Sequence, residues 1–98
     1  MKRYLVLVFY TANPGMREAF VREVADAGIL DEIRREDGAI RYEYYYSAEN
    51  EDGILLTEEW AGEKEQQVHL QKPHMERLKE MKGRFIGQTQ LLFQGMVG

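Results

Sequence analysis

The first apolar segment, residues 3–12, carries hydrophobic side chains at both alternating sets of positions. It is short for a helix and rich in β-branched and aromatic residues, which is typical of a strand. A sheet with one solvated face would show a polar residue at every second position of such a strand. We therefore predict a strand over 3–12 whose two faces are covered by different parts of the structure.

A helical pattern follows this strand. The Asn-Pro-Gly sequence at 13–15 predicts a helix start, because Asn can cap free amides and Pro fits the first helical position. Hydrophobic residues then recur at helical spacing over 16–35, and Gly28 predicts a kink or break within this span. Gly38 is placed to end the helical element in a left-handed conformation.

Two further strands are predicted over 39–48 and 54–61, separated by a short polar loop that ends in glycine. Alternate residues of the first share a face, with Ile40, Tyr42, Tyr44 and Tyr46 on one side and Arg41, Glu43 and Tyr45 on the other. Strands joined by so short a loop should pair antiparallel.

The remaining pattern predicts a helix over 62–70, a second helix over 73–82 that Gly83 stops, and a last strand over 84–94. The resulting order is β-α-β-β-α-β, which is typical of ferredoxin-like α+β folds. We expect a four-stranded antiparallel sheet with the helices on one face. Its other face keeps more apolar side chains than a solvated face should, so we expect a second copy to cover it in a homodimer.

Length and composition narrow the class of protein. The chain has 98 residues, with 13 basic and 17 acidic side chains, a net charge of −4 and no cysteine. These features exclude disulfides and thiolate metal sites, and they disfavour nucleic acid and membrane surfaces as partners. No apolar run approaches the roughly 20 residues that span a bilayer, and the run over 4–10 lacks a signal-peptide cleavage site. We therefore expect a cytoplasmic protein with a single domain over 1–98.

Several segments, in their order along the chain, resemble the antibiotic-biosynthesis monooxygenase family. These segments are Asn13-Pro14-Gly15, the run from Arg35 to Glu43, Glu58-Glu59-Trp60, and His69 with Pro73-His74. The resemblance implies a dimeric α/β barrel with one pocket per subunit, between the helices and the sheet. The family includes quinol-type oxygenases that use no flavin or metal, haem-degrading enzymes and an isomerase of a phosphorylated signalling molecule, so the fold alone does not define the function.

Trp60 and His69 are the first candidate site residues. The resemblance implies that both side chains reach the pocket, Trp60 as an apolar wall and His69 as a polar contact. Such a pair could stack an aromatic substrate and accept a proton from its hydroxyl, because imidazole titrates near neutral pH. The alternative is that Trp60 belongs to the core and that His69 is a hydrogen-bonded helix residue.

Three further residues are candidates for substrate binding. Glu58 shares a strand face with Trp60 and could hold His69 or a substrate hydroxyl. The phenol of Tyr44 could orient a quinol, although tyrosine stripes are more often core or interface. His74 could line the pocket or bond to the preceding loop.

Glu59 lies on the strand face opposite to Glu58 and Trp60, and the pattern alone leaves open which face borders the pocket. The acid that points away from the pocket is better explained by an ion pair across a dimer, with Arg41 or Arg84 as its partner.

No metal or cofactor is expected from the sequence. His69 and His74 are five residues apart, which places them on different faces of a helix, and Pro73 disrupts the register further. No compact carboxylate partner completes a metal site, and nothing resembles a phosphate-binding loop or a dinucleotide turn. The first strand also lacks the asparagine of haem-degrading relatives, which argues against haem degradation.

The family resemblance, with Trp60 and His69 as its specific support, implies a cofactor-independent monooxygenase that oxidises a small electron-rich aromatic, a quinol or polyphenol, with dioxygen. In this hypothesis His69 removes the phenolic proton while Trp60 holds the ring. One alternative is an isomerase of a small hydroxyketone or phosphorylated signalling molecule. A third hypothesis is a non-catalytic dimeric module that binds a small ligand.

Overall fold

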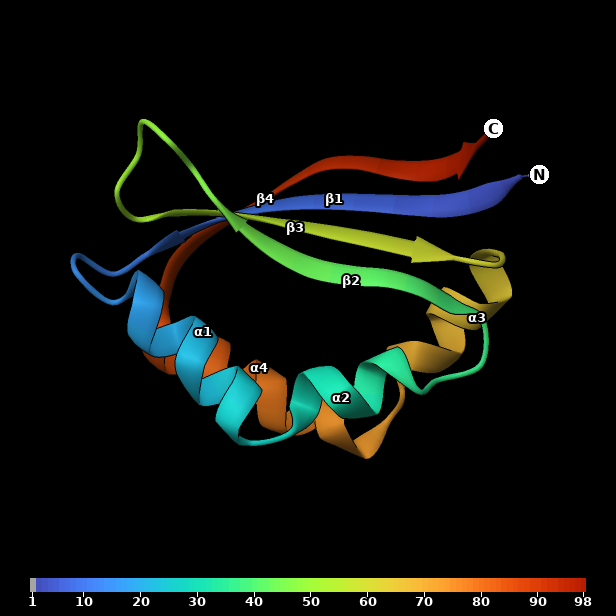
Figure 1. Ribbon diagram of the computed structural model, residues 1–98, viewed down its shortest axis with the longest axis horizontal. Helices are drawn as coiled ribbons and strands as arrows, with labels where there is room; N and C mark the ends of the chain where they lie inside the picture. The colour runs from blue at the N-terminus through green and yellow to red at the C-terminus, as the bar shows by residue number, and fades with distance from the viewer. Residues whose placement is uncertain (1) are drawn as a thin grey trace.

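The computed structural model describes residues 2–98, which form a sheet with a layer of helices beneath it (Figure 1). The strands are β1 (Arg3–Ala12), β2 (Ala39–Tyr46), β3 (Gly53–Trp60) and β4 (Ile86–Val97). The helices are α1 (Arg17–Asp26), α2 (Ile29–Arg34), α3 (Glu63–His69) and α4 (Pro73–Phe85). Among residues 2–98, no helix is both long and apolar enough to cross a membrane.

The strand order confirms the predicted ferredoxin-like α+β fold. The sheet runs β2-β3-β1-β4, and every neighbouring pair is antiparallel. β1 lies inside the sheet, where Leu7 is aligned with Thr57 of β3 on one side and with Phe93 of β4 on the other. This central position gives both edges of β1 a hydrogen-bonded neighbour, while the helices cover one of its two faces (Figure 1).

The core fills the space between the sheet and the helices. Its fully buried residues include Phe20, Val24, Ile29, Ile33, Ile54, Trp60 and Leu78. Tyr42 and Tyr44 also point to this side, where the Tyr44 ring lies 5.7 Å from the Phe20 ring. The tyrosine stripe is therefore part of the helix-facing core, although it is incomplete: Tyr46 is exposed, and Ile40 is exposed beside an irregularity in the β2–β3 register.

The predicted breaks at two glycines are confirmed, but the predicted helix start at 13–15 is wrong. Gly28 and Gly38 both have a φ near 78°, and α2 begins directly after Gly28. At the first turn, α1 begins only at Arg17, and the Asn13 side chain donates a hydrogen bond to the Arg84 carbonyl at 3.3 Å. The Asn13 carbonyl accepts from the Met16 amide at 2.9 Å, so this segment closes a turn before the helix.

Gly83 does not end the last helix as predicted. α4 continues to Phe85, and β4 begins at Ile86 and runs to Val97. The Phe85 ring packs 6.1 Å from the Phe20 ring, and Arg84 pairs with Glu23 of α1 at 2.6 Å. These tertiary contacts outweigh the roughly 1 kcal/mol that a glycine costs inside a helix.

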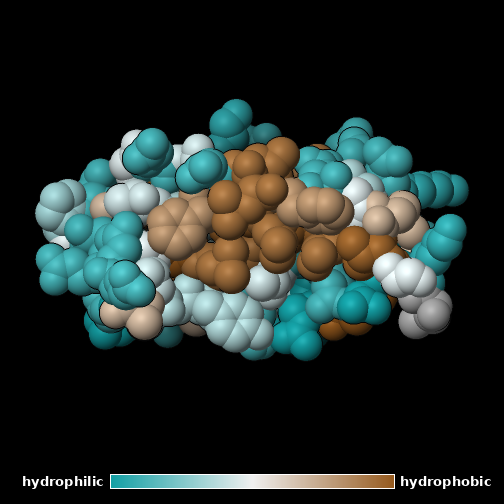
Figure 2. Space-filling model, turned by 90° about the horizontal axis from the view of Figure 1, so that it is seen from above, coloured by the Kyte–Doolittle hydropathy of each residue, from teal (hydrophilic) through white to brown (hydrophobic). Residues whose placement is uncertain are grey.

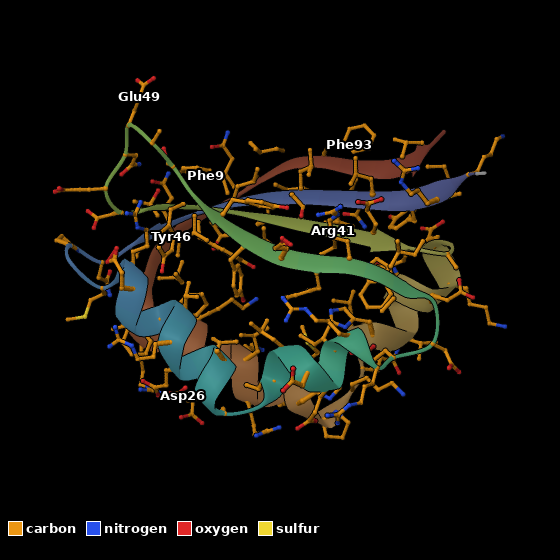
Figure 3. The ribbon with its side chains drawn as sticks, viewed as in Figure 1. Phe9, Asp26, Arg41, Tyr46, Glu49 and Phe93 are labelled. Carbon is orange, nitrogen blue, oxygen red and sulfur yellow. The ribbon has the colours of Figure 1, made fainter. Side chains whose placement is uncertain are left out.

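The other face of the sheet is covered by no element of residues 2–98, and Figure 2 shows an apolar band across it. Leu5, Leu7 and Phe9 of β1 alternate with buried core residues, so they point to this open face. Figure 3 shows the Phe93 ring on the side of the sheet away from the helices, and its side chain is 40% exposed.

Glu59 also lies on the open face, where it pairs within the chain. Its carboxylate contacts Arg41 at 2.7 Å and also contacts Arg3. Arg84 pairs with Glu23 instead. The ion pair that we predicted across a dimer is therefore formed within one subunit.

Candidate functional site

Two histidines and a glutamate from separate segments meet at one end of the helix layer. His69 is the last residue of α3 and His74 is the second residue of α4, while Glu36 follows α2. The chain turns between the two histidines, because Leu70 to Lys72 leave the helix and Pro73 starts a new one. We call Glu36, His69 and His74 the Glu36 cluster.

Both imidazoles contact the same carboxylate oxygen. His69 Nδ1 lies 3.0 Å from Glu36 Oε2, and His74 Nε2 lies 2.7 Å from it. All three side chains are more than nine-tenths buried. The predicted separation of the two histidines is thus wrong, because α3 and α4 are not one helix and the carboxylate comes from a distant part of the chain. Two imidazole nitrogens and a carboxylate oxygen are a donor set that could hold a transition-metal ion.

A glycine fixes the segment that carries Glu36. Gly38 has a left-handed backbone, and its carbonyl accepts a hydrogen bond from the Ala61 amide at 2.8 Å. A Cβ atom at position 38 would lie only 2.5 Å from Glu65 Cγ of α3. The loop therefore approaches α3 more closely than any side chain would permit.

The other edge of the His69 ring faces the interior. The ring centroid lies 4.6 Å from that of Trp60, and Nε2 is buried with no hydrogen-bond partner among residues 2–98. The nearest carboxylate oxygen, Glu58 Oε1, is 4.0 Å away. Burial lowers the pKa of His69, although the Glu36 carboxylate opposes this effect. A proton held on Nδ1 for Glu36 leaves the Nε2 lone pair free.

Glu58 is a buried acid beside Trp60. Its Oε1 accepts a hydrogen bond from Trp60 Nε1 at 3.0 Å. Burial raises the pKa of Glu58 to about 7, while this hydrogen bond and the charge of Lys82 oppose the increase. Burial also lowers the pKa of Lys82. Near neutral pH, Glu58 is thus able both to hold and to release a proton.

Tyr44 brings a second unpaired polar atom to the interior. Its hydroxyl is buried and finds no partner in the described part of the chain. Burial raises the pKa of Tyr44, so the phenol keeps its proton at neutral pH. Tyr42 lies between the two functional groups, with its ring 6.1 Å from that of Tyr44 and 5.7 Å from that of His69.

The structure thus divides the predicted site residues into two groups. Trp60, His69 and Glu58 contact or approach one another inside the core, and Tyr44 reaches them through Tyr42. His74 lies on the other side of Glu36, beside a surface groove lined by Glu32, Arg35, Glu36, Lys72 and His74. Sequence reasoning missed Glu36, whose only signal is its place within the segment from Arg35 to Glu43.

The sequence and the fold both have known relatives. The model of the antibiotic biosynthesis monooxygenase family matches residues 3–81. Among solved structures, protein SO0527 from Shewanella oneidensis has a TM-score of 0.83 and 16% identity, over 99% of this chain and 94% of that one. No curated protein sequence matches the chain.

Two further solved structures share the fold. A candidate antibiotic biosynthesis monooxygenase from Nitrosomonas europaea has a TM-score of 0.83 and 19% identity, over 95% of this chain and 88% of that one. Rv0793 from Mycobacterium tuberculosis has a TM-score of 0.75 and 23% identity, over 93% of each chain. At these identities the likeness shows the fold alone.

Proposed function

The chain belongs to the antibiotic biosynthesis monooxygenase family, and from this premise we propose that it is a cofactor-independent monooxygenase. The proposed substrate is a small electron-rich aromatic, a quinol or polyphenol, and the oxidant is dioxygen. A quinol and dioxygen together give a hydroxyquinone and water, so this reaction balances without an external reductant. The chemistry that the protein must supply is therefore positioning and proton transfer.

The observation that carries this proposal is the setting of His69. Glu36 holds Nδ1 at 3.0 Å, and Nε2 is buried, unpaired among the described residues and next to Trp60. In the proposed reaction, Nε2 accepts the phenolic proton, and the Glu36 carboxylate stabilises the imidazolium that forms. Trp60 holds the substrate ring, and the resulting anion is rich enough in electrons to react with dioxygen.

Glu58 and Tyr44 have supporting roles in this proposal. Glu58, with its pKa raised by burial to about 7, can donate a proton to the reduced oxygen as water leaves. The Tyr44 hydroxyl, which has no partner within residues 2–98, can donate a hydrogen bond to a substrate oxygen. The loss of either group should slow turnover less than the loss of His69.

The proposed test is oxygen uptake with a panel of quinols. We expect the wild type to consume oxygen and His69→Ala to lower kcat by about 10²- to 10⁴-fold, the usual contribution of a general base. Glu49→Gln, at the tip of the β2–β3 loop far from the site, is the matched control and should leave the rate unchanged (Figure 3). Equal rates in the wild type and His69→Ala would remove His69 from the mechanism.

An isomerase is the second candidate, favoured by the 4.0 Å separation between His69 Nε2 and Glu58 Oε1. Two groups able to exchange protons at this distance could move a proton between neighbouring carbons of a small hydroxyketone or phosphorylated signalling molecule. Product formation retained under strict anaerobiosis would favour this reaction. Retention of a ligand without turnover in either assay would instead favour a non-catalytic binding module.

We also propose that the protein acts as a homodimer in the cytoplasm. The support for the dimer is the apolar band on the open face of the sheet (Figure 2), which a second copy would bury as an α/β barrel. The family's dimeric barrel implies the same packing. Neither nucleic acid nor a membrane is expected as a partner, in keeping with the net charge of −4.

A further inference from the structure

We propose that the Glu36 cluster binds a divalent transition-metal ion of the Zn²⁺, Fe²⁺ or Co²⁺ type. The ligands would be His69 Nδ1, His74 Nε2 and a carboxylate oxygen of Glu36. This inference concerns the outer edge of the His69 ring and does not rest on the proposed function. An ion on Nδ1 would place the ring proton on Nε2, so a metal-bound chain would not use Nε2 as the base proposed above. It replaces the sequence-based expectation that no metal binds.

The spacing of the donor atoms suits one ion. The two nitrogens lie 3.0 and 2.7 Å from Glu36 Oε2, and all three donor atoms are within 4.8 Å of one another. Two donors that are each about 2.1 Å from an ion and about 90° apart lie roughly 3.0 Å from each other. Small side-chain rotations would therefore bring the three atoms onto one ion. Imidazole nitrogens with one carboxylate select transition metals over Ca²⁺ and Mg²⁺, which prefer all-oxygen sites.

The second nitrogen of each histidine faces another carboxylate. His74 Nδ1 lies 3.1 Å from Glu32 Oε2, and His69 Nε2 lies 4.0 Å from Glu58 Oε1. Histidines that ligate metals commonly donate their other N–H to a carboxylate, which orients the ring and raises its basicity. His74 has this arrangement at hydrogen-bond distance.

Hydrogen bonding alone leaves these groups incompletely satisfied. His74 has a carboxylate at each nitrogen, and hydrogen bonds can satisfy both carboxylates only if both ring nitrogens carry a proton. Glu36 Oε1 is buried and has no partner in the described part of the chain. An ion at the cluster would accept the Nε2 lone pair, leave the single proton of His74 on Nδ1 for Glu32, and neutralise the Glu36 charge.

The electrostatics and the access route also favour a cation. Glu32, Glu36 and Glu58 surround the two imidazoles. Part of this negative charge is offset by Arg77, which pairs with Glu32 at 2.7 Å, by Lys82 near Glu58, and by Arg35 and Lys72 on the groove rim. The groove reaches the cluster directly, because Glu36 and His74 form part of its lining. An ion could therefore enter from solvent without separating the helices from the sheet.

The proposed test is titration of the chelator-treated full chain with Co²⁺, followed by visible d–d absorption. We expect one ion per chain, no binding signal for His74→Ala, and binding weakened by about 10- to 100-fold for Glu32→Gln, since Glu32 acts through His74. Glu49→Gln is the control and should bind like the wild type. Circular dichroism of each variant shows whether it is folded.

A second measurement keeps the test independent of the variants. Zn²⁺ added to the ¹⁵N-histidine-labelled wild type should shift the ring resonances of His69 Nδ1 and His74 Nε2, while leaving the other nitrogen of each ring protonated. If the folded wild type showed neither Co²⁺ d–d absorption nor Zn²⁺-induced shifts of the histidine resonances at millimolar concentrations of the ions, the proposal would be overturned. Co²⁺ binding that is unchanged in folded His74→Ala would also overturn it. Neither readout uses quinol turnover, so a failure of the proposed function would leave this result unaffected.

Discussion

The two faces of the sheet differ in the groups that they leave without partners, although Thr57 Oγ1 on the open face is also a buried polar atom with no hydrogen bond among residues 2–98. On the helix side, His69 Nε2 and the Tyr44 hydroxyl are buried polar atoms with no hydrogen bond among residues 2–98. On the open side, apolar side chains such as Phe93 lie in solvent, and the charged residues pair with one another. Unpaired buried polar atoms indicate a ligand or a reaction, while exposed apolar area indicates a protein surface. This contrast supports chemistry on one face and assembly on the other.

The strongest test of the contrast compares an aromatic residue from each face. Trp60 is fully buried on the helix side, so Trp60→Ala should lower the free energy of unfolding by about 3–5 kcal/mol. In the isolated subunit, Phe93→Ala removes a ring that is already 40% exposed and should cost less than about 1.5 kcal/mol, so the comparison is made at a protein concentration below that of dimer formation. Urea unfolding at one protein concentration measures both values. Equal losses in the free energy of unfolding for the two variants would show that the open face contributes as much to stability as the core does.

A charge on the open face should break the proposed dimer. Leu7 is aligned with Phe93 at the centre of the sheet, so Leu7→Asp would bury a carboxylate in the interface and weaken association by at least about 100-fold. Met16→Asp, at an exposed apolar residue just before α1, is the control and should stay dimeric. Light scattering at micromolar concentration gives the masses. A wild type that elutes as a monomer would contradict the dimer itself.

Glu58 gives a pH test of the helix side. Burial raises the pKa of Glu58 from 4.5 to about 7, so the folded protein holds this proton more tightly than the unfolded chain. Below pH 4.5 the buried Glu58 side chain is protonated in both states and does not lower the free energy of unfolding. As the pH rises towards 7, the buried group lowers the free energy of unfolding, because the unfolded chain releases the proton first. Glu58→Gln should exceed the wild type in stability by on the order of 2–3 kcal/mol at pH 8 and by little at pH 4.

Denaturant unfolding of the two proteins across this pH range measures that difference. Glu59→Gln, one residue along β3 and on the open face, is the matched control. It should not reproduce the same pH dependence, because its carboxylate is paired with Arg41 rather than isolated in the core. If the difference in the free energy of unfolding between Glu58→Gln and the wild type did not change with pH, the raised pKa of Glu58 would be contradicted.

The smallest effect is expected at the ion pair on the open face. Arg41 contacts Glu59 at 2.7 Å, but its side chain is 46% exposed, so Arg41→Gln should cost no more than about 1 kcal/mol. The cost should decline further in high salt, since screening weakens exposed pairs. If Arg41→Gln lowered the free energy of unfolding by more than about 1 kcal/mol, and only at protein concentrations where the dimer forms, the ion pair would lie at the subunit interface.

Sequence reasoning predicted most of the fold because the relevant signals are local. The strand over residues 3–12 and the breaks at Gly28 and Gly38 depend on neighbouring residues, and the structure confirms them, while the cover predicted for the second face of that strand stays a prediction. The ends of helices were less predictable. α4 passes through Gly83 because contacts of Phe85 with a distant helix hold its last turn, and no local pattern contains such contacts.

The candidate site was predictable only in part. The place of Glu58 and Trp60 on one strand face follows from strand alternation, and the structure confirms it. The contact of both histidines with Glu36 could not be predicted from the local sequence pattern, because Glu36 is 33 residues before His69 in the chain. A restart at Pro73 was predicted, but the direction of the new helix depends on tertiary packing. The dimer, the substrate and the catalytic role of His69 stay predictions.

Gly38 has a consequence for how relatives of this protein can diverge. Its left-handed backbone and its close approach to Glu65 determine how the Glu36 loop meets α3. A larger residue at position 38 would be strained by the left-handed backbone and would require either Glu65 or the loop that carries Glu36 to shift, although it would contact neither histidine. Selection for the cluster should therefore act on a residue that has no chemistry of its own. Among homologues, loss of this glycine and loss of the Glu–His–His set should occur together.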